Sequence, residues 1–262
     1  MKIDKKVRLK HYLLGVLGLF TFFLVWELAI RFGFISHRVM ALPTEVLDTF
    51  LTKLGDPRPD GGTLPQHFLT SFTLAISGFG LAVLVGVPLG LFMGYFKAFD
   101  RYVMPIFEII RPIPPIAWIP IVIIVLGIGM SAKIFIIFIA SFVACVINSY
   151  LGIKLTNQVY INVSRTSGAS HWQTFTTVCV PSALPMVFAG IRYSLGGAWG
   201  TLVAAEMLAS TGGLGFMIQM GRLLIRPDII IVGMLTIGLT GALLAKALAE
   251  IEARIIPWRT KK

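Results

Sequence analysis

Six long apolar windows constrain this chain more than any other feature of its sequence. The windows run over about residues 12–30, 68–96, 103–128, 133–152, 183–207 and 229–249. A helix that crosses a bilayer needs about 20 mostly apolar residues. Within a bilayer only helices and closed barrels satisfy every backbone polar group. The sequence therefore predicts an all-α integral membrane protein with six transmembrane helices.

The composition agrees with a membrane protein and argues against a soluble globule. Of the 262 residues, 56% are hydrophobic and only 13% are charged, whereas about 25% of the residues in soluble domains are charged. The formal net charge is +11, but the basic residues lie in short segments between the apolar windows and form no stripe for a nucleic acid. Cys145 and Cys179 lack metal-ligand or disulfide spacing, so we expect two buried apolar thiols.

The basic residues between the windows predict the orientation of the chain. With the N-terminus inside, thirteen Lys and Arg residues face the cytoplasm and seven face the outside. The positive-inside rule therefore places both termini in the cytoplasm of a multi-pass protein of the cell membrane. The first window is interpreted as a retained helix and not as a signal peptide, because it exceeds the usual apolar stretch of about 7–15 residues.

We expect three regions along the chain. Residues 1–65 hold a cytoplasmic tail, the first span and an external loop, in which Val46–Leu54 forms an interfacial helix with Thr44 as its N-cap. Residues 66–250 form a core of five transmembrane helices. Residues 251–262 form a basic cytoplasmic tail.

The polar segment between the fourth and fifth windows is the most informative part of the sequence. It runs over residues 154–177 and carries Gly168 near its middle. Ser170 and Gln173 have the spacing of a capping box, which marks the start of a helix. We expect a helix, a turn at Gly168 and a second helix. Such a segment is too long for a simple connector, and it acts either as a docking surface or as an ordinary interfacial loop.

The sequence lacks the common motifs of enzyme active sites. It has no P-loop, no H-E-x-x-H pair and no G-x-S-x-G elbow. We therefore expect no catalytic site, no metal site and no cofactor in this chain. An ion-coupled secondary carrier or a channel is one interpretation of the spans, although few ionisable residues lie in the windows. A membrane-bound enzyme is a weaker alternative.

Prolines interrupt the third window. Each of Pro114 and Pro115 removes a backbone donor, and a broken helix at membrane depth is tolerated only beside protein or a cavity. Arg111, Pro114, Pro115 and Trp118 therefore either line a transport pathway or belong to a helix that begins late, with Arg111 extending to the membrane interface.

The fifth window offers further pathway candidates. Trp199 and Thr201 are candidates for facing the pathway. Glu206 lies near the outer end of this window, where it either pairs with Arg222 or Arg226 and shapes an outer gate or remains a solvated residue at a helix end.

The polar segment resembles a known motif. Permeases of ATP-binding-cassette (ABC) importers carry E-A-A, three residues, Gly, nine residues and I-x-L-P. Here the same spacing joins Asn162-Val163-Ser164, Gly168 and Val178-Cys179-Val180-Pro181. Asn162 stands where the family has Glu.

Further segments resemble the nitrate/sulfonate/taurine-type permeases, and within that group the taurine and aliphatic sulfonate permeases. These segments are Leu42-Pro43-Thr44, Arg111-Pro112-Ile113-Pro114-Pro115, Gly190-Ile191-Arg192, Gly200-Thr201-Leu202-Val203-Ala204-Ala205-Glu206, Gly213-Leu214-Gly215-Phe216 and Pro257-Trp258.

The resemblance implies a type I ABC importer transmembrane domain with a cytoplasmic coupling helix. It implies a second permease copy, two cytosolic ATPase subunits that bind ATP and Mg²⁺, and an external or periplasmic binding protein that delivers a small anion. Taurine or an aliphatic sulfonate is the first choice, followed by nitrate, bicarbonate, an aromatic carboxylate or a thiamine precursor. The residues implied in ATPase coupling are Asn162, Ser164, Arg165, Gly168, Ala169, Ser170 and Pro181.

Overall fold

The computed structural model describes residues 5–37 and 39–257, and every regular element within them is a helix. The long helices are α1 (Lys5–Arg31), α3 (Leu64–Tyr95), α6 (Met130–Lys154), α9 (Val180–Ala209) and α11 (Pro227–Ile255). The shorter ones are α2 (Pro43–Lys53), α4 (Lys97–Ile110), α5 (Ile119–Leu126), α7 (Gln158–Thr166), α8 (His171–Thr174) and α10 (Leu214–Leu223). A 3₁₀ turn (Pro115–Trp118) precedes α5, and a π-helical segment (Phe175–Cys179) joins α8 to α9.

The expected membrane spans are confirmed, with one change of shape. Five helices of the described chain are long and apolar enough to cross a membrane. The third window is a bent pair, α4 and α5, whose axes differ by 85°, and it makes a sixth span if the pair counts as one. The bend follows from the prolines around residues 112–115, which remove backbone donors and exclude a straight helix.

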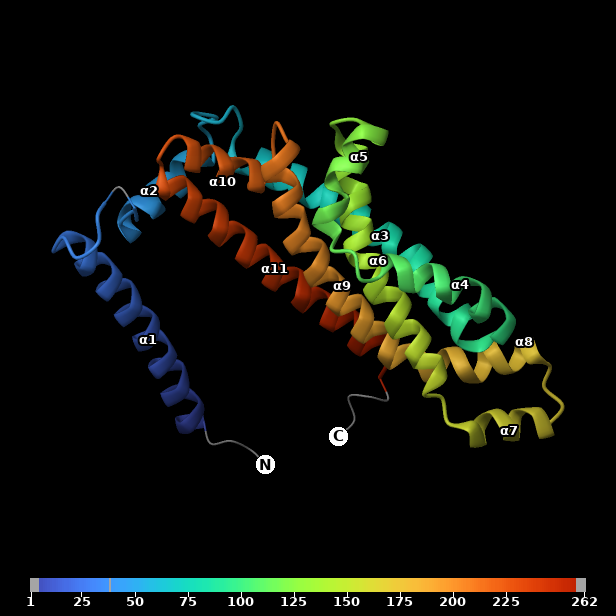
Figure 1. Cartoon of the computed structure of the whole chain (residues 1–262). Coiled ribbons are helices and arrows are strands. Elements are labelled where there is room, and N and C mark those ends of the chain that lie inside the picture. The colour runs from blue at the N-terminus through green and yellow to red at the C-terminus, as the bar shows by residue number, and fades with distance from the viewer. Residues whose placement is uncertain (1–4, 38, 258–262) are drawn as a thin grey trace.

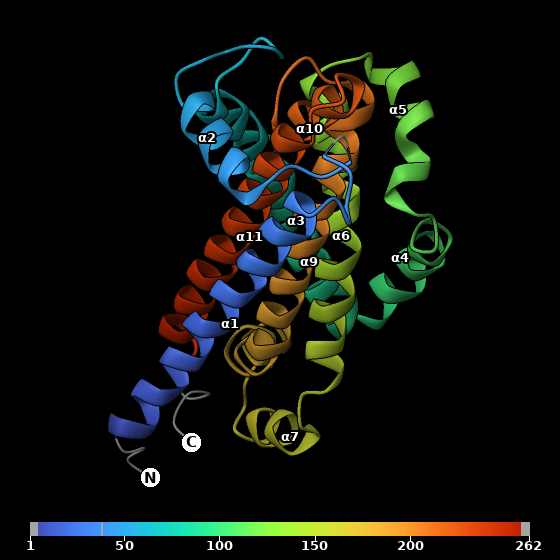
Figure 2. The same ribbon diagram turned by 90° about the vertical axis from the view of Figure 1, so that its left-hand side faces the viewer.

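The fifth span is longer than its apolar window. A continuous run of helix extends from His171 to Met207 and changes direction between α8 and α9 (Figures 1 and 2), whereas the sequence places its start near residue 183. The polar segment before Pro181 continues into the span because Pro181 occupies the first turn of α9, where a missing N–H breaks no hydrogen bond within that helix.

Three helices, α3, α6 and α9, pack side by side and form the core of the molecule. Gly86, Gly90 and Gly94 of α3 face α6 at four-residue spacing. A Cβ atom at Gly90 would overlap the carbonyl oxygen of Val146. Small residues at this spacing let two helix backbones approach closely, as is common between membrane helices.

Most of the short helices lie near the two ends of the molecule. The turn between α7 and α8 lies at one end, which we name the hairpin end, and α2 and α10 lie at the other, which we name the loop end (Figure 1). The start of α1 and the end of α11 point toward the hairpin end (Figure 2).

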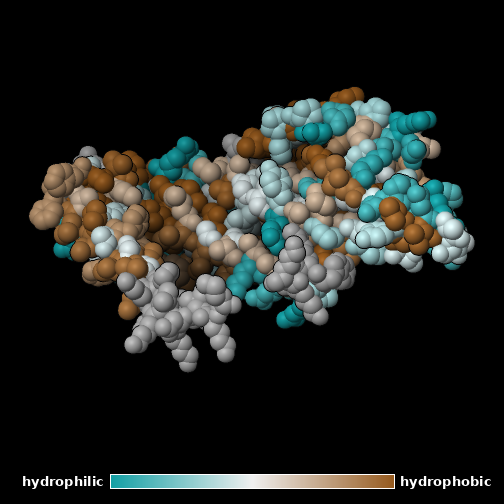
Figure 3. Space-filling model, turned by 90° about the horizontal axis from the view of Figure 1, so that it is seen from below, coloured by the Kyte–Doolittle hydropathy of each residue, from teal (hydrophilic) through white to brown (hydrophobic). Residues whose placement is uncertain are grey.

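The helix α1 stands apart from the core and contacts α2 (Figure 1). Its apolar side chains are open, with Leu17 59% and Phe20 62% exposed. Seen from below, apolar surface gathers on the side of α1, and hydrophilic surface gathers on the opposite side, toward α7 and α8 (Figure 3). Lipid is the environment that such a helix requires.

The interfacial helix exists, but it begins at Pro43 with Leu42 as its N-cap, so Thr44 is not the cap. Proline is favoured at the first helical position because its missing N–H has no partner there.

Of the expected basic tail, residues 251–255 continue α11. Residues 258–262 lie outside the described part of the chain, as do residues 1–4 at the other end.

Candidate functional site

The segment predicted to dock on a partner forms a helical hairpin. The helix α7 ends at Thr166, the chain turns through Gly168, and α8 starts at His171. The helix–turn–helix expected from the sequence is therefore confirmed. In Figure 1 the turn projects from the hairpin end, beyond the long helices.

The turn at Gly168 is a Schellman motif. Gly168 has φ +85°, its N–H donates to the Arg165 carbonyl at 3.0 Å, and the Ala169 N–H donates to the Ser164 carbonyl at 3.1 Å. These two bonds satisfy carbonyls that a helix end leaves free. Nothing lies within 4 Å of a Cβ atom at Gly168, so the backbone conformation, and not space within this chain, requires glycine here.

The second arm of the hairpin starts with the expected capping box. The Gln173 N–H donates to Ser170 Oγ at 3.2 Å, and the Ser170 N–H donates to Gln173 Oε1 at 2.8 Å. The two arms are also linked directly, because Ser164 Oγ lies 3.1 Å from Thr174 Oγ1. Ser164 and Ser170 therefore hold the hairpin's shape.

Aromatic rings fix the base of the hairpin to the end of α3. Phe175 lies 5.4 Å from Phe92 and 5.1 Å from Tyr95, measured between ring centroids. Trp172 stacks on Phe92 at 6.3 Å, and the Tyr95 hydroxyl donates to the His171 carbonyl at 2.9 Å. Aromatic pairs add about 0.5–1.5 kcal/mol each beyond buried area, so the hairpin base is rigid against α3.

The outer face of α7 is open. Val159 and Val163 are each 59% exposed and Tyr160 is 60% exposed. Asn162 and Arg165 are exposed on the same helix, and Asn162 Oδ1 accepts from Gln158 Nε2 at 3.1 Å. Three large apolar side chains on a polar helix outside the spans form a surface suited to a protein partner.

Pro181 lies just beyond the π-helical segment. A π-helical turn marks a local irregularity that is often found at functional sites. Phe175 and Cys179 within it are buried against Ile153 of α6 and Ala183 of α9. The residues implied in coupling thus span one continuous unit from α7 to the start of α9.

The pathway candidates of the third window lie around the bend between α4 and α5. Arg111 caps α4, its side chain is 49% exposed, and its Nη1 donates to Glu108 at 2.9 Å. Pro114 is exposed, and Pro115 shares a pocket with Arg111. Trp118 instead packs with Ile119 and Val122, so the structure brings only Arg111 and Pro115 together.

The pathway candidates of α9 separate. Trp199 is 8% exposed, and its Nε1 donates to the Ile237 carbonyl of α11 at 2.9 Å. Trp199 therefore packs between α9 and α11, and its place in a pathway stays a prediction. Thr201 is half-buried on α9.

The expected pairing of Glu206 with Arg222 or Arg226 is wrong. Glu206 is 1% exposed, and its carboxylate accepts from Ser71 Oγ at 2.7 Å and from the Gly215 N–H at 2.8 Å. Arg226 is paired with Asp228 at 2.6 Å. Glu206 therefore binds the first turn of α10, where free N–H groups favour a negative charge.

Further polar groups complete this network at the loop end. The Gly213 N–H donates to His67 Nδ1 at 3.0 Å, and the Leu214 N–H donates to Ser71 Oγ at 2.7 Å. Three successive N–H groups of the chain entering α10 are thus satisfied by α3 and α9. The sequence did not single out His67 or Ser71, because their partners are more than 130 residues away.

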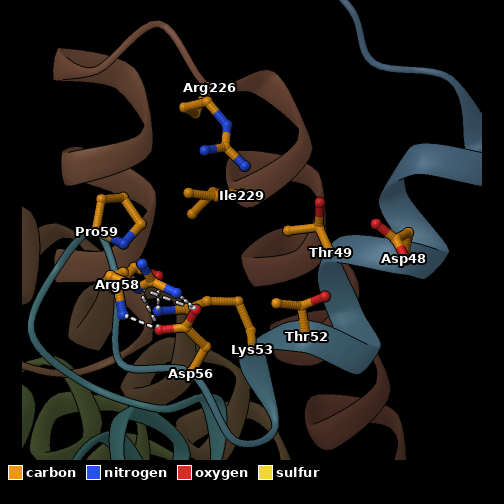
Figure 4. Close-up of a pocket in the computed structure, with 9 residues that line it drawn as sticks. All are labelled: Asp48, Thr49, Thr52, Lys53, Asp56, Arg58, Pro59, Arg226 and Ile229. Atoms are coloured by element: carbon orange, nitrogen blue, oxygen red, sulfur yellow. Dashed lines mark hydrogen bonds and ion pairs between the residues drawn. The ribbon is translucent and has the colours of Figure 1, made fainter.

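A buried ion pair anchors the external loop. Lys53 Nζ lies 2.5 Å from Asp60 Oδ1 and donates to the Gly62 carbonyl at 2.7 Å. Burial alone would raise the pKa of Asp60, but hydrogen bonds from His67 and Lys53 outweigh it and hold that pKa below its usual value. Beside this pair lies a pocket of about 310 Å³, which Arg58 and Arg226 also line (Figure 4).

The fold and the hairpin together define a multi-pass membrane protein whose helical core carries a polar helical hairpin at one end. The family model described as "Binding-protein-dependent transport system inner membrane component" matches residues 86–257. The chain belongs to this family, which confirms the resemblance to ABC importer permeases and a place in the inner membrane.

Curated relatives and a solved structure agree with the family. The chain is 36% identical to the Taurine transport system permease protein TauC of Escherichia coli, with 89% of this chain and 85% of the relative covered. It is 35% identical to the Nitrate import permease protein NrtB of Synechocystis sp., with 84% and 81% covered. The inward-facing MetNI methionine ABC transporter has a similar fold, with a TM-score of 0.55, 20% identity, and 69% of this chain and 93% of that chain covered.

Proposed function

We propose that two copies of this chain form the pathway of an ABC importer for a small anion, and that the hairpin from α7 to α8 couples this pathway to two cytosolic ATPase subunits. The hairpin carries the proposal: it projects beyond the long helices, exposes Val159, Tyr160 and Val163, and continues without a break into α9. ATP and Mg²⁺ bind the partner subunits. This chain then serves as a non-catalytic subunit.

The arrangement suits mechanical coupling. The ring contacts between Phe175 and α3, together with the Schellman turn, make the hairpin a rigid body. Rigid elements with two packed arrangements transmit such motions. Closure of the ATPase subunits then tilts α9 and α3 together and switches the pathway between inward and outward access.

We propose that the hairpin end faces the cytoplasm. The excess of basic residues in segments that share this side supports it. Both termini are then cytoplasmic, and the loop end with α2 and α10 faces the external or periplasmic binding protein.

For the substrate we propose taurine or another aliphatic sulfonate. The support is the match to a taurine permease over most of both chains. Nitrate, bicarbonate, an aromatic carboxylate and a thiamine precursor are the alternatives. Similar matches to nitrate and bicarbonate permeases favour the first two of these.

The test reconstitutes the chain in liposomes with its coexpressed ATPase and binding protein. We expect uptake of radiolabelled taurine that requires ATP, and co-purification of the ATPase. Val163→Asp should abolish both, because a charge then enters the apolar docking face. Val39→Asp is the matched control, since Val39 is 75% exposed at the loop end. Uptake by this chain alone, driven by an ion gradient without ATP, would instead establish a secondary carrier.

A further inference from the structure

A half-open pocket of about 250 Å³ lies between the bend that joins α4 to α5 and the helix α6, with Tyr193 of α9 at its edge. Most of its wall is apolar. Three polar side chains enter it, namely Arg111 from the end of α4, Asn148 from α6 and Tyr193 from α9. An apolar pocket with a few convergent polar groups is the usual form of a small-ligand site.

We propose that this pocket is an oxyanion-binding site in the transport pathway, with Arg111, Asn148 and Tyr193 as donors to the charged head of the substrate. The proposal rests on the proposed importer function and names the residues that recognise its substrate class.

Each of the three side chains has a donor group that remains available for a ligand. Arg111 uses Nη1 for Glu108, and the rest of its guanidinium fork has no protein partner within the described residues. Asn148 Nδ2 donates one hydrogen to the Ala144 carbonyl at 2.9 Å, which leaves its second hydrogen free. The Tyr193 side chain is 76% exposed, and its hydroxyl is a further donor.

Asn148 is held in place by its neighbours. Gly190 of α9 packs so closely that a Cβ atom there would lie 2.5 Å from Asn148 Cβ. The hydrogen bond to Ala144 fixes the amide along α6. A donor that is positioned before the ligand arrives binds with less loss of side-chain entropy.

The bend lies at middle depth, between the hairpin end and the loop end (Figure 2). A charged arginine at this depth is costly beside lipid and is usually found beside water or a functional partner. The face of α9 next to it is open, because Tyr193, Gly196 and Gly200 recur along one side of the helix. A Cβ atom at Gly196 or Gly200 would meet nothing within 4 Å.

The donor set suits a small oxyanion. The planar fork of arginine matches two oxygens of a sulfonate, carboxylate or nitrate in a bidentate way. The amide N–H and the phenol O–H supply two further hydrogen bonds from other directions. The site would hold one cationic side chain against one anionic group of the substrate, which gives weak binding. Weak binding suits a transport pathway, because the substrate must also leave the site.

The test compares Arg111→Gln with Glu108→Gln in the reconstituted complex. We expect Arg111→Gln to reduce uptake of radiolabelled taurine at least about tenfold, because a charge-assisted contact is lost. Glu108→Gln removes the same ion pair but keeps the arginine, and it should retain at least half of the wild-type uptake. Equal losses in both variants would show a structural ion pair and overturn the proposal.

A second measurement does not depend on knowing the substrate. Arg111→Cys should react with a membrane-impermeant maleimide, and taurine, nitrate or bicarbonate should slow that reaction. Cys145 and Cys179 are buried and give the background, which Arg111→Ser measures. Absence of labelling with and without ATP would overturn the proposal. If the wild-type complex takes up none of these three anions, the proposed substrate fails, and the labelling alone decides whether the pocket is open to water.

Discussion

Replacing Gly168 tests how much the hairpin depends on one backbone conformation. Gly168 has φ +85°, and a Cβ atom there would meet nothing within 4 Å. The cost of a side chain is therefore conformational and not steric. For alanine that cost is about 1–2 kcal/mol, and for β-branched valine it is larger. Asparagine tolerates positive φ, so the conformational cost of Gly168→Asn should be smaller than that of Gly168→Ala.

In such a variant the hairpin either keeps the positive φ at residue 168, at this conformational cost, or changes the conformation of its turn. Changing it breaks the bonds from the Gly168 and Ala169 N–H groups. A loss of about 1–2 kcal/mol lowers the ratio of formed to unformed hairpin about 5- to 30-fold. Binding of the ATPase to the permease in nanodiscs, and ATP-driven uptake, should therefore fall in the order wild type, Gly168→Asn, Gly168→Ala, Gly168→Val.

The position of asparagine in this series is decisive. Asparagine is larger than alanine, so crowding by the ATPase would make Gly168→Asn worse than Gly168→Ala. A backbone requirement gives the opposite order. Wild-type ATPase affinity in Gly168→Val, or an asparagine variant below the alanine variant, would refute the reasoning.

Four further predictions follow from other contacts. Ser170→Ala should destabilise the start of α8 by about 1 kcal/mol, measured as faster amide exchange at Gln173, with no change there if the cap is unimportant. Glu206→Ala leaves the buried Gly215 N–H without its acceptor, so thermal unfolding in detergent should show a loss of about 1–3 kcal/mol. Because the pKa of Asp60 is lowered from its usual 3.8, its ion pair stabilises the fold above that pH and is lost as the pH falls through the lower folded value. The stability difference between wild type and Asp60→Asn should therefore be large at neutral pH and vanish in strong acid, and a difference that is constant with pH would contradict this. Gly90→Leu should prevent the close packing of α3 on α6 and abolish folded yield, whereas Gly80→Leu, which meets open space, should not.

The elements that the sequence predicts well are those with local signals. Apolar length alone identifies the spans. The hairpin follows from a capping box and a glycine within a few residues of each other, so its turn is predictable without knowledge of the rest of the fold. The bend between α4 and α5 is also signalled locally, by prolines, although its angle of 85° depends on packing against α6.

The network around Glu206 shows where sequence reasoning stops. Proximity in the chain suggested Arg222 or Arg226 as partners. The real partners are Ser71, which is 135 residues away, and the backbone of Gly215. Which side of α9 faces α3 is decided by three-helix packing, so a helix of mixed small and apolar residues does not reveal it. For the same reason the sequence does not reveal that Trp199 packs against α11.

The change of direction between α8 and α9 has a geometric consequence. The 30 residues of α9 at about 1.5 Å each extend about 45 Å, which matches the whole bilayer of about 40–45 Å. The helix α8 lies across the end of α9 (Figures 1 and 2). The hairpin would thus lie along the membrane surface as a lever arm, and a soluble protein that presses on it would apply a torque to the end of α9.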